Sequence, residues 1–396
     1  MCLESQKGSP SYNDLATRFE TVYQTSPSKQ AISKKINPAC VQFFQSVLAL
    51  ILLSRLPKAQ LDFIKNGNTL YKRILVQDST IIKLPQRLFK IFSGVSNGHT
   101  AVCNARIQGV YDLLSGSFIS FSIDTYTKND VVSASELELC RGDLALRDRG
   151  YFKNSEIPRH IEAGADFIFR YKHKTLIFDP STNQQINLLD LLKKNKSIDM
   201  EVCLSDYPHV KVRIVASPVS EQIANSRRRK AKLDYKRYPL SAENLELMGW
   251  TIFLTSIPKE QADCHKILMI YGLRWRIEII FKTWKSHMQF AKVHNVSENH
   301  LRIMIIARFI MIVICMQIIY IICYQRVLSK FNRHISLFKL MGYLMKNPEK
   351  ITEILYSNIN LGYALRSTDD VLRKYCTYDQ RKRLNFNQLA MMSFLS

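Results

Sequence analysis

The stretch Tyr271–Lys285, YGLRWRIEIIFKTWK, decides the interpretation of this chain. At about 100° per residue it predicts a single helix with two distinct faces. One face carries a lone carboxylate among cations and a phenol: Tyr271, Arg274, Glu278, Lys282 and Lys285. The adjacent face is apolar and must pack on a core: Leu273, Ile277, Ile280, Phe281 and Trp284. The polar face suits a group that binds a metal beside a nucleic-acid phosphate, and a solvated face with i,i+4 ion pairs is the alternative.

Two more carboxylates lie on predicted strands upstream. Residues 73–84, RILVQDSTIIKL, predict a β-branched strand with Asp78 at its middle, where an ionised carboxylate is costly unless something pairs with it. Asp78 could instead face solvent by alternation. Residues 144–148, LALRD, predict a short strand that ends on Asp148, and strand ends carry the ligand-binding groups of open α/β sheets. The pattern is completed by a hairpin over 104–125, a helix over 130–140, a helix from Gly150 to about Ala163 and a strand over 167–172.

Residues 174–255 fill the long gap between that last strand and the Tyr271–Lys285 helix. They alternate in a β-like way around NSRRRKAKLDYKRYP (225–239), which predicts a basic, turn-rich loop. Seven cations are concentrated there: Arg227, Arg228, Arg229, Lys230, Lys232, Lys236 and Arg237. Because Tyr235 and Tyr238 are interleaved with them, a phosphate-tracking patch is as good an interpretation as a solvated loop.

The overall charge favours a polyanionic partner. Lys plus Arg total 56 against 33 Asp plus Glu, a net charge of +23 in 396 residues. Such a surplus repels itself, so nucleic acid is the first candidate partner and an anionic membrane surface the second. The nine cysteines show no zinc-type spacing and Met1–Ser11 is polar, so we expect a cytoplasmic protein with reduced thiols. The apolar stretch Phe309–Tyr324 is 16 residues long and predicts a buried helix rather than a membrane span.

Three blocks in order, QDSTIIKLP, RDRGYF and YGLRWRIEIIFKTWK, resemble those of the IS4 family of insertion-sequence transposases. The resemblance covers about residues 74–290 and rests most of all on the spacing Tyr-x2-Arg-x3-Glu-x6-Lys. It implies an α/β fold with a ribonuclease-H-like (retroviral-integrase-like) core, a β-rich insertion and flanking helical N- and C-terminal regions. The implied organisation is a helical DNA-binding region at 1–66, core at 67–173, insertion at 174–255, core with the Glu278 helix at 256–330 and a helical region at 331–396.

The resemblance also implies roles for particular residues. Asp78, Asp148 and Glu278 match the catalytic DDE triad, which in the family holds two Mg²⁺ ions, with Mn²⁺ able to substitute. The implied DNA contacts are Tyr271, Arg274, Arg276, Lys282 and Lys285, with Trp250 placed to stack on an extruded base. The implied activity is cut-and-paste transposition: cleavage of transposon ends and strand transfer on double-stranded DNA. The implied partners are terminal inverted repeats, target DNA and a second copy of the chain in a homodimeric synaptic complex on the bacterial nucleoid.

Three alternatives stay open from the residues alone. A ribonuclease-H-like nuclease or resolvase without transposition would share the three carboxylates but not the long insertion. An inactive or domesticated DNA-binding protein would keep the basic charge and the helical N-terminus, where Lys29, Lys34 and Lys35 suit a helix-turn-helix-like reader or a plain helical bundle. A membrane-associated basic protein would need residues 309–324 exposed to lipid.

Overall fold

A computed structural model describes residues 10–53, 70–94, 102–205, 207–234, 240–356, 368–379 and 384–394. Within these residues nine strands form a single sheet in the order β3-β2-β1-β4-β5-β9-β8-β7-β6. Five of them precede residue 174: β1 (Arg73–Lys83), β2 (Asn104–Asp112), β3 (Ser117–Thr125), β4 (Asp143–Arg147) and β5 (Asp166–Arg170). The other four are β6 (Ile177–Phe178), β7 (Ile198–Leu204), β8 (Tyr207–Pro218) and β9 (Trp250–Thr255).

The first five strands form a ribonuclease-H-like core, as predicted. β2 and β3 are an antiparallel hairpin that turns at Gly116, whose φ of 66° suits glycine. β1 pairs in parallel with β4, from Arg73 opposite Asp143 to Val76 opposite Leu146, and β4 pairs in parallel with β5. The buried apolar runs of β1 and β4 are those expected of central parallel strands covered on both faces.

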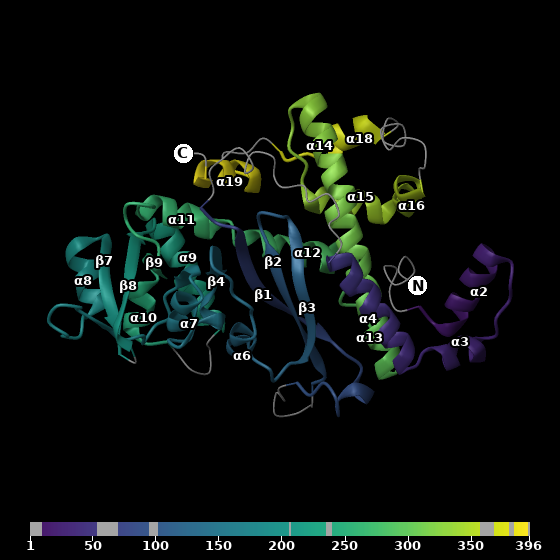
Figure 1. Cartoon of the computed structure of the whole chain (residues 1–396), viewed down its shortest axis with the longest axis horizontal. Helices are drawn as coiled ribbons and strands as arrows, with labels where there is room; N and C mark the ends of the chain where they lie inside the picture. The colour runs from purple at the N-terminus through teal and green to yellow at the C-terminus, as the bar shows by residue number, and fades with distance from the viewer. Residues whose placement is uncertain are drawn as a thin grey trace. The chain divides into compact units, whose positions relative to one another are not determined.

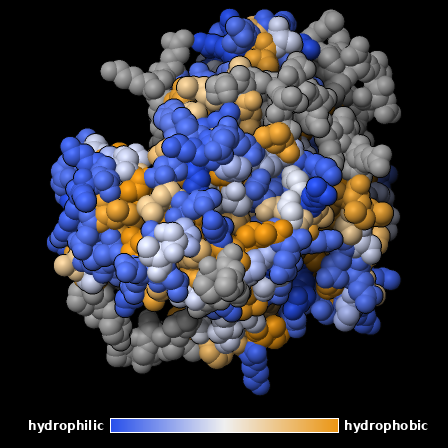
Figure 2. All heavy atoms as spheres, turned by 60° about the vertical axis from the view of Figure 1, so that its left-hand side comes forward, coloured by the Kyte–Doolittle hydropathy of each residue, from blue (hydrophilic) through white to orange (hydrophobic). Residues whose placement is uncertain are grey.

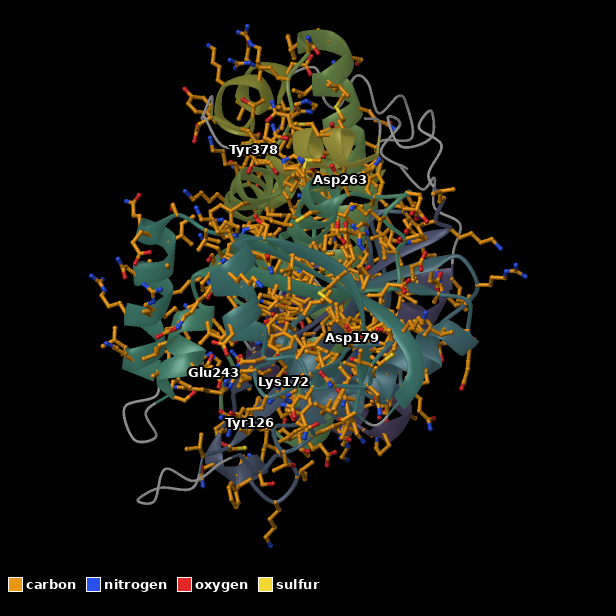
Figure 3. The ribbon with its side chains drawn as sticks, turned by 90° about the vertical axis from the view of Figure 1, so that its left-hand side faces the viewer. Tyr126, Lys172, Asp179, Glu243, Asp263 and Tyr378 are labelled. Carbon is orange, nitrogen blue, oxygen red and sulfur yellow. The ribbon has the colours of Figure 1, made fainter. Side chains whose placement is uncertain are left out.

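The β-rich insertion is also present and extends the same sheet. β9 runs antiparallel to β5, and β8 and β7 continue the sheet with antiparallel pairing. Their alternate apolar side chains share one buried core with β5 and α8 (Leu188–Asn195). Nε2 of His173 lies 3.4 Å from the Glu243 carboxylate. Glu243 and Lys172 of this part of the chain are labelled in Figure 3.

The prediction of a turn-rich loop at 225–239 is wrong wherever the structure describes it. α9 (Glu221–Asp234) is helical and buries Ala224 and Ala231, two turns apart, on one face. Its Arg, Lys, Gln and Ala residues are good helix formers, so the run of charges signalled a solvated helix face rather than a break. The predicted residues Tyr235, Lys236, Arg237 and Tyr238 lie outside the described part of the chain.

The prediction of one continuous helix over Tyr271–Lys285 is also wrong. α11 (Cys264–Gly272), capped by Asp263 (Figure 3), ends at Gly272, and α12 (Trp275–His287) begins three residues later. The N–H groups of Leu273 and Arg274 turn back onto the carbonyls of Ile270 and Tyr271 in tight bonds of 3.1 and 3.0 Å. Glycine is a poor helix former and favours such an end. Tyr271 and Glu278 therefore lie on two different helices.

The predicted apolar face of α12 does pack on a core. Trp284 is 1% exposed and its ring lies 5.2 Å from that of Phe118 on β3 and 6.1 Å from that of Phe309. A Cβ at Gly109 of β2 would lie 3.2 Å from Cε1 of Phe118, so glycine there leaves room for the Phe118 ring that packs on Trp284. This packing holds the helix of Glu278 across the hairpin.

Helices lie at both ends of the chain, as predicted, and short ones connect the strands. The early ones are α2 (Tyr12–Tyr23), α3 (Lys29–Lys35) and α4 (Pro38–Leu53), with α3 and α4 bent by 67° to one another. Between the strands lie η1 (Gln86–Leu88), α6 (Asp130–Ser135), η2 (Arg149–Tyr151), α7 (Glu156–Glu162) and α10 (Ala242–Leu247). The helix predicted over 130–140 is thus shorter, and the one predicted from Gly150 begins as the η2 turn. The late helices are α13 (Glu298–Ile314), the π-helical turn η3 (Cys315–Ile319), α14 (Tyr320–Phe331), α15 (Leu337–Lys346), α16 (Pro348–Tyr356), α18 (Asp369–Tyr375) and α19 (Phe386–Phe394).

The apolar run of α13 is explained by burial. Among the described helices, the stretch Glu298–Phe331 is by itself long and apolar enough to cross a membrane, and 78% of its most apolar window is buried inside the protein. α3 and α4 pass the same test only if the bent pair counts as one span. α4 lies alongside α13, where Val41 packs against Ile303, Ile306 and Ile310 (Figure 1). On the face drawn in Figure 2, hydrophilic residues surround smaller hydrophobic patches.

The chain divides into two compact units. One consists of residues 1–67, 78–129 and 275–388, and the other of residues 68–77, 130–274 and 389–396. The first holds α12 with β2 and β3, and the second holds β4 to β9 with α9 and α11.

Candidate active site

Asp148 follows directly on β4 and is surrounded by cations. Its carboxylate lies 3.9 Å from Nη1 of Arg170, at the end of β5. The phenol of Tyr271, on α11, lies 3.4 Å from both Oδ1 of Asp148 and the carbonyl of Arg147. Tyr271 in turn packs on Phe253, with ring centres 4.3 Å apart, and lies under the guanidinium of Arg274. Tyr271, Arg274 and Asp148 are thus brought together although 123 residues separate the aspartate from the tyrosine.

The charges at this cluster keep Asp148 ionised. Burial alone would raise the pKa of Asp148, but the cations of Arg274, Arg170 and Arg149 and the N–H of Arg149 hold that pKa below its usual value. Burial and the neighbouring Asp148 raise the pKa of Tyr271, so its phenol stays protonated and donates. The cluster therefore presents a carboxylate anion with cations around it.

A buried ion-pair network fixes the strand end that carries Asp148. Arg147 is fully buried and donates from Nη1 to Glu156 at 2.6 Å and from Nη2 to the carbonyl of Ala134 at 3.0 Å. Arg159 adds a second contact of 3.1 Å to the same Glu156 oxygen. Arg147, which directly precedes Asp148, is therefore held in one geometry by charge-assisted bonds.

His160 makes the stability of this region depend on pH. Its Nδ1 bonds to the carbonyl of Glu156 at 2.6 Å, and burial together with the cations Arg147 and Arg159 lowers its pKa to about 3. Below pH 6.5 the unfolded chain binds a proton here that the folded chain does not, so the free energy of unfolding falls between pH 6.5 and about 3. From pH 6.5 to pH 4.5, we expect wild type to lose roughly 2 kcal/mol more than His160→Gln in urea unfolding. Equal losses in the two proteins would contradict this placement.

Asp78 lies on β1 two residues beyond Val76, just as Asp148 lies two residues beyond its partner Leu146. Oδ1 of Asp78 accepts the N–H of Ser79 at 2.8 Å, and the Ser79 hydroxyl accepts a bond of 3.1 Å from Arg106 on β2. Asp78 is half-buried, so the interpretation of a carboxylate simply turned to solvent is not favoured.

α12 carries the third predicted carboxylate and three of the predicted DNA contacts, Arg276, Lys282 and Lys285. Glu278 is half-buried in its first turn, while Lys282 and Lys285 are exposed one and two turns later. Nζ of Lys282 lies 5.2 Å above the ring of Phe338 on α15, which supports the lysine stem without neutralising its charge. Both lysines are placed where a phosphate could reach them.

Arg276 lies on the same helix, but its side chain is buried inside the protein. It is 6% exposed, and its guanidinium lies 5.3 Å from the ring of Tyr320 and 4.8 Å from that of Phe386. Burial would lower its pKa, but the phenols of Tyr320, Tyr111 and Tyr378 outweigh burial and raise it (Tyr378 is labelled in Figure 3). A guanidinium stacked among aromatic rings holds helices together and does not offer itself to DNA.

The donor atoms of the predicted ligands determine which metal ion they could hold. Within the described residues no group of three or more His, Cys, Asp or Glu side chains is arranged to hold an ion. The three predicted ligands are nonetheless all carboxylates, the oxygen donors that Mg²⁺ prefers: Asp78 lies within β1, Asp148 directly follows β4 and Glu278 lies on α12. The donor set therefore fits a hard divalent cation.

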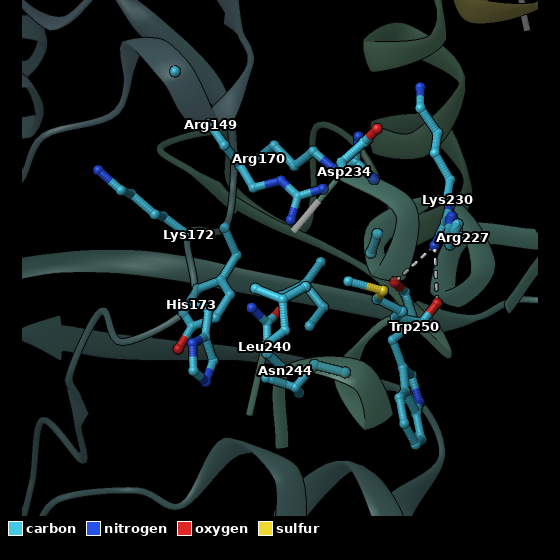
Figure 4. Close-up of a pocket in the computed structure, with 16 residues that line it drawn as sticks. Arg149, Arg170, Lys172, His173, Arg227, Lys230, Asp234, Leu240, Asn244 and Trp250 are labelled. Atoms are coloured by element: carbon cyan, nitrogen blue, oxygen red, sulfur yellow. Dashed lines mark hydrogen bonds between the residues drawn. The ribbon is translucent and has the colours of Figure 1, made fainter. Parts of the chain in front are cut away.

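A basic hollow of about 830 Å³ lies beside the Asp148 cluster. Arg149 and Arg170 line one side of it and Arg227 and Lys230 of α9 the other, with Lys172 also at its wall (Figure 4). Trp250, at the start of β9, lines it too, and its indole N–H donates to the carbonyl of Lys196 at 2.7 Å. Five of the side chains that line it are cationic and one, Asp234, is anionic, so the net positive charge of the hollow fits an anionic group next to a flat ring.

Sequence reasoning missed Arg170 and Arg149 as site residues and took Arg227 only as part of a basic patch. A signal was present for Arg170, because it lies near the end of the predicted strand FIFRYK and the strand-end rule that marked Asp148 applies there too; in the structure it is the last residue of β5. No such signal marks Arg227, whose place depends on the unexpected helix α9.

The chain is similar to several known proteins. A family model described as a transposase DDE domain matches residues 71–314. The transposase for insertion sequence element IS231E of Bacillus thuringiensis subsp. finitimus is 26% identical over 86% of this chain and 78% of its own length. That for IS231B of Bacillus thuringiensis subsp. berliner is 27% identical over 90% and 79%, and that for IS1151 of Clostridium perfringens is 24% identical over 96% and 84%. A cryo-EM structure of the piggyBac transposase synaptic complex with hairpin DNA aligns with a TM-score of 0.41 at 12% identity, covering 98% of this chain and 76% of that one.

Proposed function

Because the chain belongs to the family of transposases with a DDE domain, we propose that it cuts the ends of an insertion sequence and joins them to target DNA. The proposed reaction is phosphodiester hydrolysis at each transposon end, followed by transesterification. The substrates are the terminal inverted repeats and a target site in double-stranded DNA. The observation that carries the proposal is the ionised Asp148 at the end of β4, with Arg170, Arg274 and Tyr271 around it.

We assign the catalytic carboxylates to Asp78, Asp148 and Glu278. Asp78 lies within β1, Asp148 directly follows β4, and Glu278 lies on a helix fixed by the Trp284 core. Together they would hold divalent metal, expected to be two Mg²⁺ ions with Mn²⁺ able to replace them. When bound, the metal would activate the attacking oxygen and stabilise the leaving oxygen of an in-line displacement.

The protein's own cations would position the DNA. Lys282 and Lys285 are exposed on α12 and would contact phosphates, which fixes register without reading sequence. Arg274 is 8% exposed and lies against Tyr271, so its main role would be to keep Asp148 ionised, with Tyr271 holding that carboxylate in place. Arg276 is not part of the proposed DNA surface, because aromatic rings enclose it.

Trp250 would stack on a base that leaves the duplex near the cleaved end. The hollow beside it offers the cations that the phosphates of such a nucleotide need. Synapsis of two ends would require two copies of the chain, and we propose a homodimer acting on bacterial chromosomal DNA in the cytoplasm. The N-terminal helices α2 to α4 would contribute sequence recognition. We also propose that the boundaries between the N-terminal region, the two parts of the core, the insertion and the C-terminal region follow residues 66, 173, 255 and 330.

The direct test uses a labelled duplex made from the genomic sequence that flanks the gene. We expect a strand break at the transposon end on addition of Mg²⁺, no break in EDTA, and binding of the duplex in both conditions. Binding without any metal-dependent break would mean a DNA-binding protein without catalysis.

A further inference from the structure

The side chain of Arg227, on α9, forms hydrogen bonds to Trp250 and to residues before and after it, Met248 and Thr251. Its Nη1 donates to the carbonyl of Trp250 at 3.0 Å and to that of Met248 at 3.3 Å (Figure 4). Its Nη2 donates to Oγ1 of Thr251 at 3.1 Å. All three acceptors are neutral oxygens of one short segment. The guanidinium therefore acts as a clamp on the first residues of β9.

The geometry of these bonds requires an arginine. Three acceptors lie around one planar group, and only a guanidinium has a rigid fork of donors that can reach them together. A lysine ammonium would keep the charge but could not satisfy the same arrangement. The variant Arg227→Lys therefore removes the forked hydrogen bonds while keeping the positive charge.

The clamp leaves a positive charge facing the hollow. Among the described residues Arg227 forms no ion pair with a carboxylate, although it is half-buried. Burial and the nearby cations Arg170 and Arg149 lower its pKa. Repulsion between the charge of Arg227 and its neighbouring cations is relieved when an anion binds in the hollow. Arg227 would therefore both hold Trp250 and contribute to the anion site.

Trp250 is held at its other end as well. Its indole N–H donates to the carbonyl of Lys196, just beyond α8, at 2.7 Å. Its peptide group is fixed by Arg227 and its ring by Lys196, so the plane of the indole is set at the edge of the hollow. Trp250 also pairs with Pro218 of β8 and packs against the apolar core, so we expect loss of Arg227 to loosen the position of the indole rather than to release it.

We propose that Arg227 is a positioning residue that fixes Trp250 for stacking on the extruded base and couples this placement to phosphate binding in the hollow. The inference rests on the proposed role of Trp250. Arg227 acts through Trp250 and does not touch the reacting atoms.

The first test needs no DNA. The fluorescence of Trp250 is obtained as the difference between each protein and its own Trp250→Phe version, which cancels Trp275 and Trp284. In Arg227→Lys we expect acrylamide quenching of Trp250 to rise about twofold, because a loosened segment admits the quencher. Arg228→Lys is the matched control, since Arg228 lies next on the same helix but bonds to Leu245 and Glu221. Unchanged quenching in Arg227→Lys would overturn the clamp.

The second test is a double-mutant cycle on cleavage of the labelled end. We expect Arg227→Lys and Trp250→Ala each to lower the cleavage rate roughly tenfold, and the double variant to be no worse than Trp250→Ala alone. Additive losses would show that Arg227 acts independently of Trp250 and overturn the coupling. If wild type cleaves no DNA, the proposed function fails, while the fluorescence result still decides whether Arg227 holds Trp250.

Discussion

Replacement of Glu278 by Gln is expected to abolish end cleavage while DNA binding survives. The change removes one charge from α12 and keeps the size of the side chain, so the packing of Trp284 and Phe281 on the hairpin is undisturbed. Loss of a metal-holding carboxylate should lower the cleavage rate by at least ~10³-fold, because the metal supplies several kcal/mol of transition-state stabilisation. Binding should change little, since Lys282 and Lys285 remain to contact phosphates.

Glu353→Gln provides the control for this prediction. Glu353 lies on α16 and pairs with Lys350 at 2.8 Å on the surface, so its loss should leave both cleavage and binding at wild-type levels. The readouts are single-turnover nicking of the labelled end and gel-shift affinity for the same duplex. Retained cleavage in Glu278→Gln would remove Glu278 from the catalytic set.

Replacement of Glu156 by Gln is expected to have the largest effect on stability. The side chains of Arg147 and Glu156 are 1% and 4% exposed and lie 2.6 Å apart, so the Glu156 carboxylate neutralises the charge of a buried arginine. Without the carboxylate, Arg147 keeps a buried charge that nothing neutralises. The cost should be about 3–5 kcal/mol, measured by urea unfolding followed by far-UV circular dichroism.

The surface pair Glu201–Lys211 is the matched control. Its atoms lie 3.7 Å apart with both side chains more than half exposed, so Glu201→Gln should cost at most ~1 kcal/mol. A loss of similar size in both variants would contradict the assigned importance of the buried pair. Because Asp148 directly follows Arg147, we also expect Glu156→Gln to lose cleavage at temperatures where it is still folded.

The sequence predicted the strand elements of this fold well, for a physical reason. β1, β4 and β9 are short runs of β-branched and apolar residues bounded by turn residues, and such local patterns determine a strand almost by themselves. Asp148 could be placed because its strand ends on it. The transposase family and the ribonuclease-H-like core followed from these elements and the spacing of three motifs.

What the sequence did not predict depended on distant partners. Arg276 looks like any basic residue of its helix, and only the rings of Tyr320 and Phe386, more than forty residues away in the chain, turn it inward. The break at Gly272 was hidden by a helical pattern that continues in sequence across two helices. Likewise α9 was mistaken for a loop because its buried residues are two alanines rather than large apolar side chains.

The measurement that tests the central claim most directly is metal rescue of cysteine variants at the three carboxylates. Mg²⁺ binds oxygen and accepts sulfur poorly, whereas Mn²⁺ tolerates a thiolate ligand better. If Asp78, Asp148 and Glu278 hold the catalytic metal, then Asp78→Cys, Asp148→Cys and Glu278→Cys should each fail to cleave the labelled end in Mg²⁺ and regain cleavage in Mn²⁺. Cleavage by these variants in Mg²⁺ at the wild-type rate, with the metal still required, would contradict the assignment of these carboxylates as metal ligands.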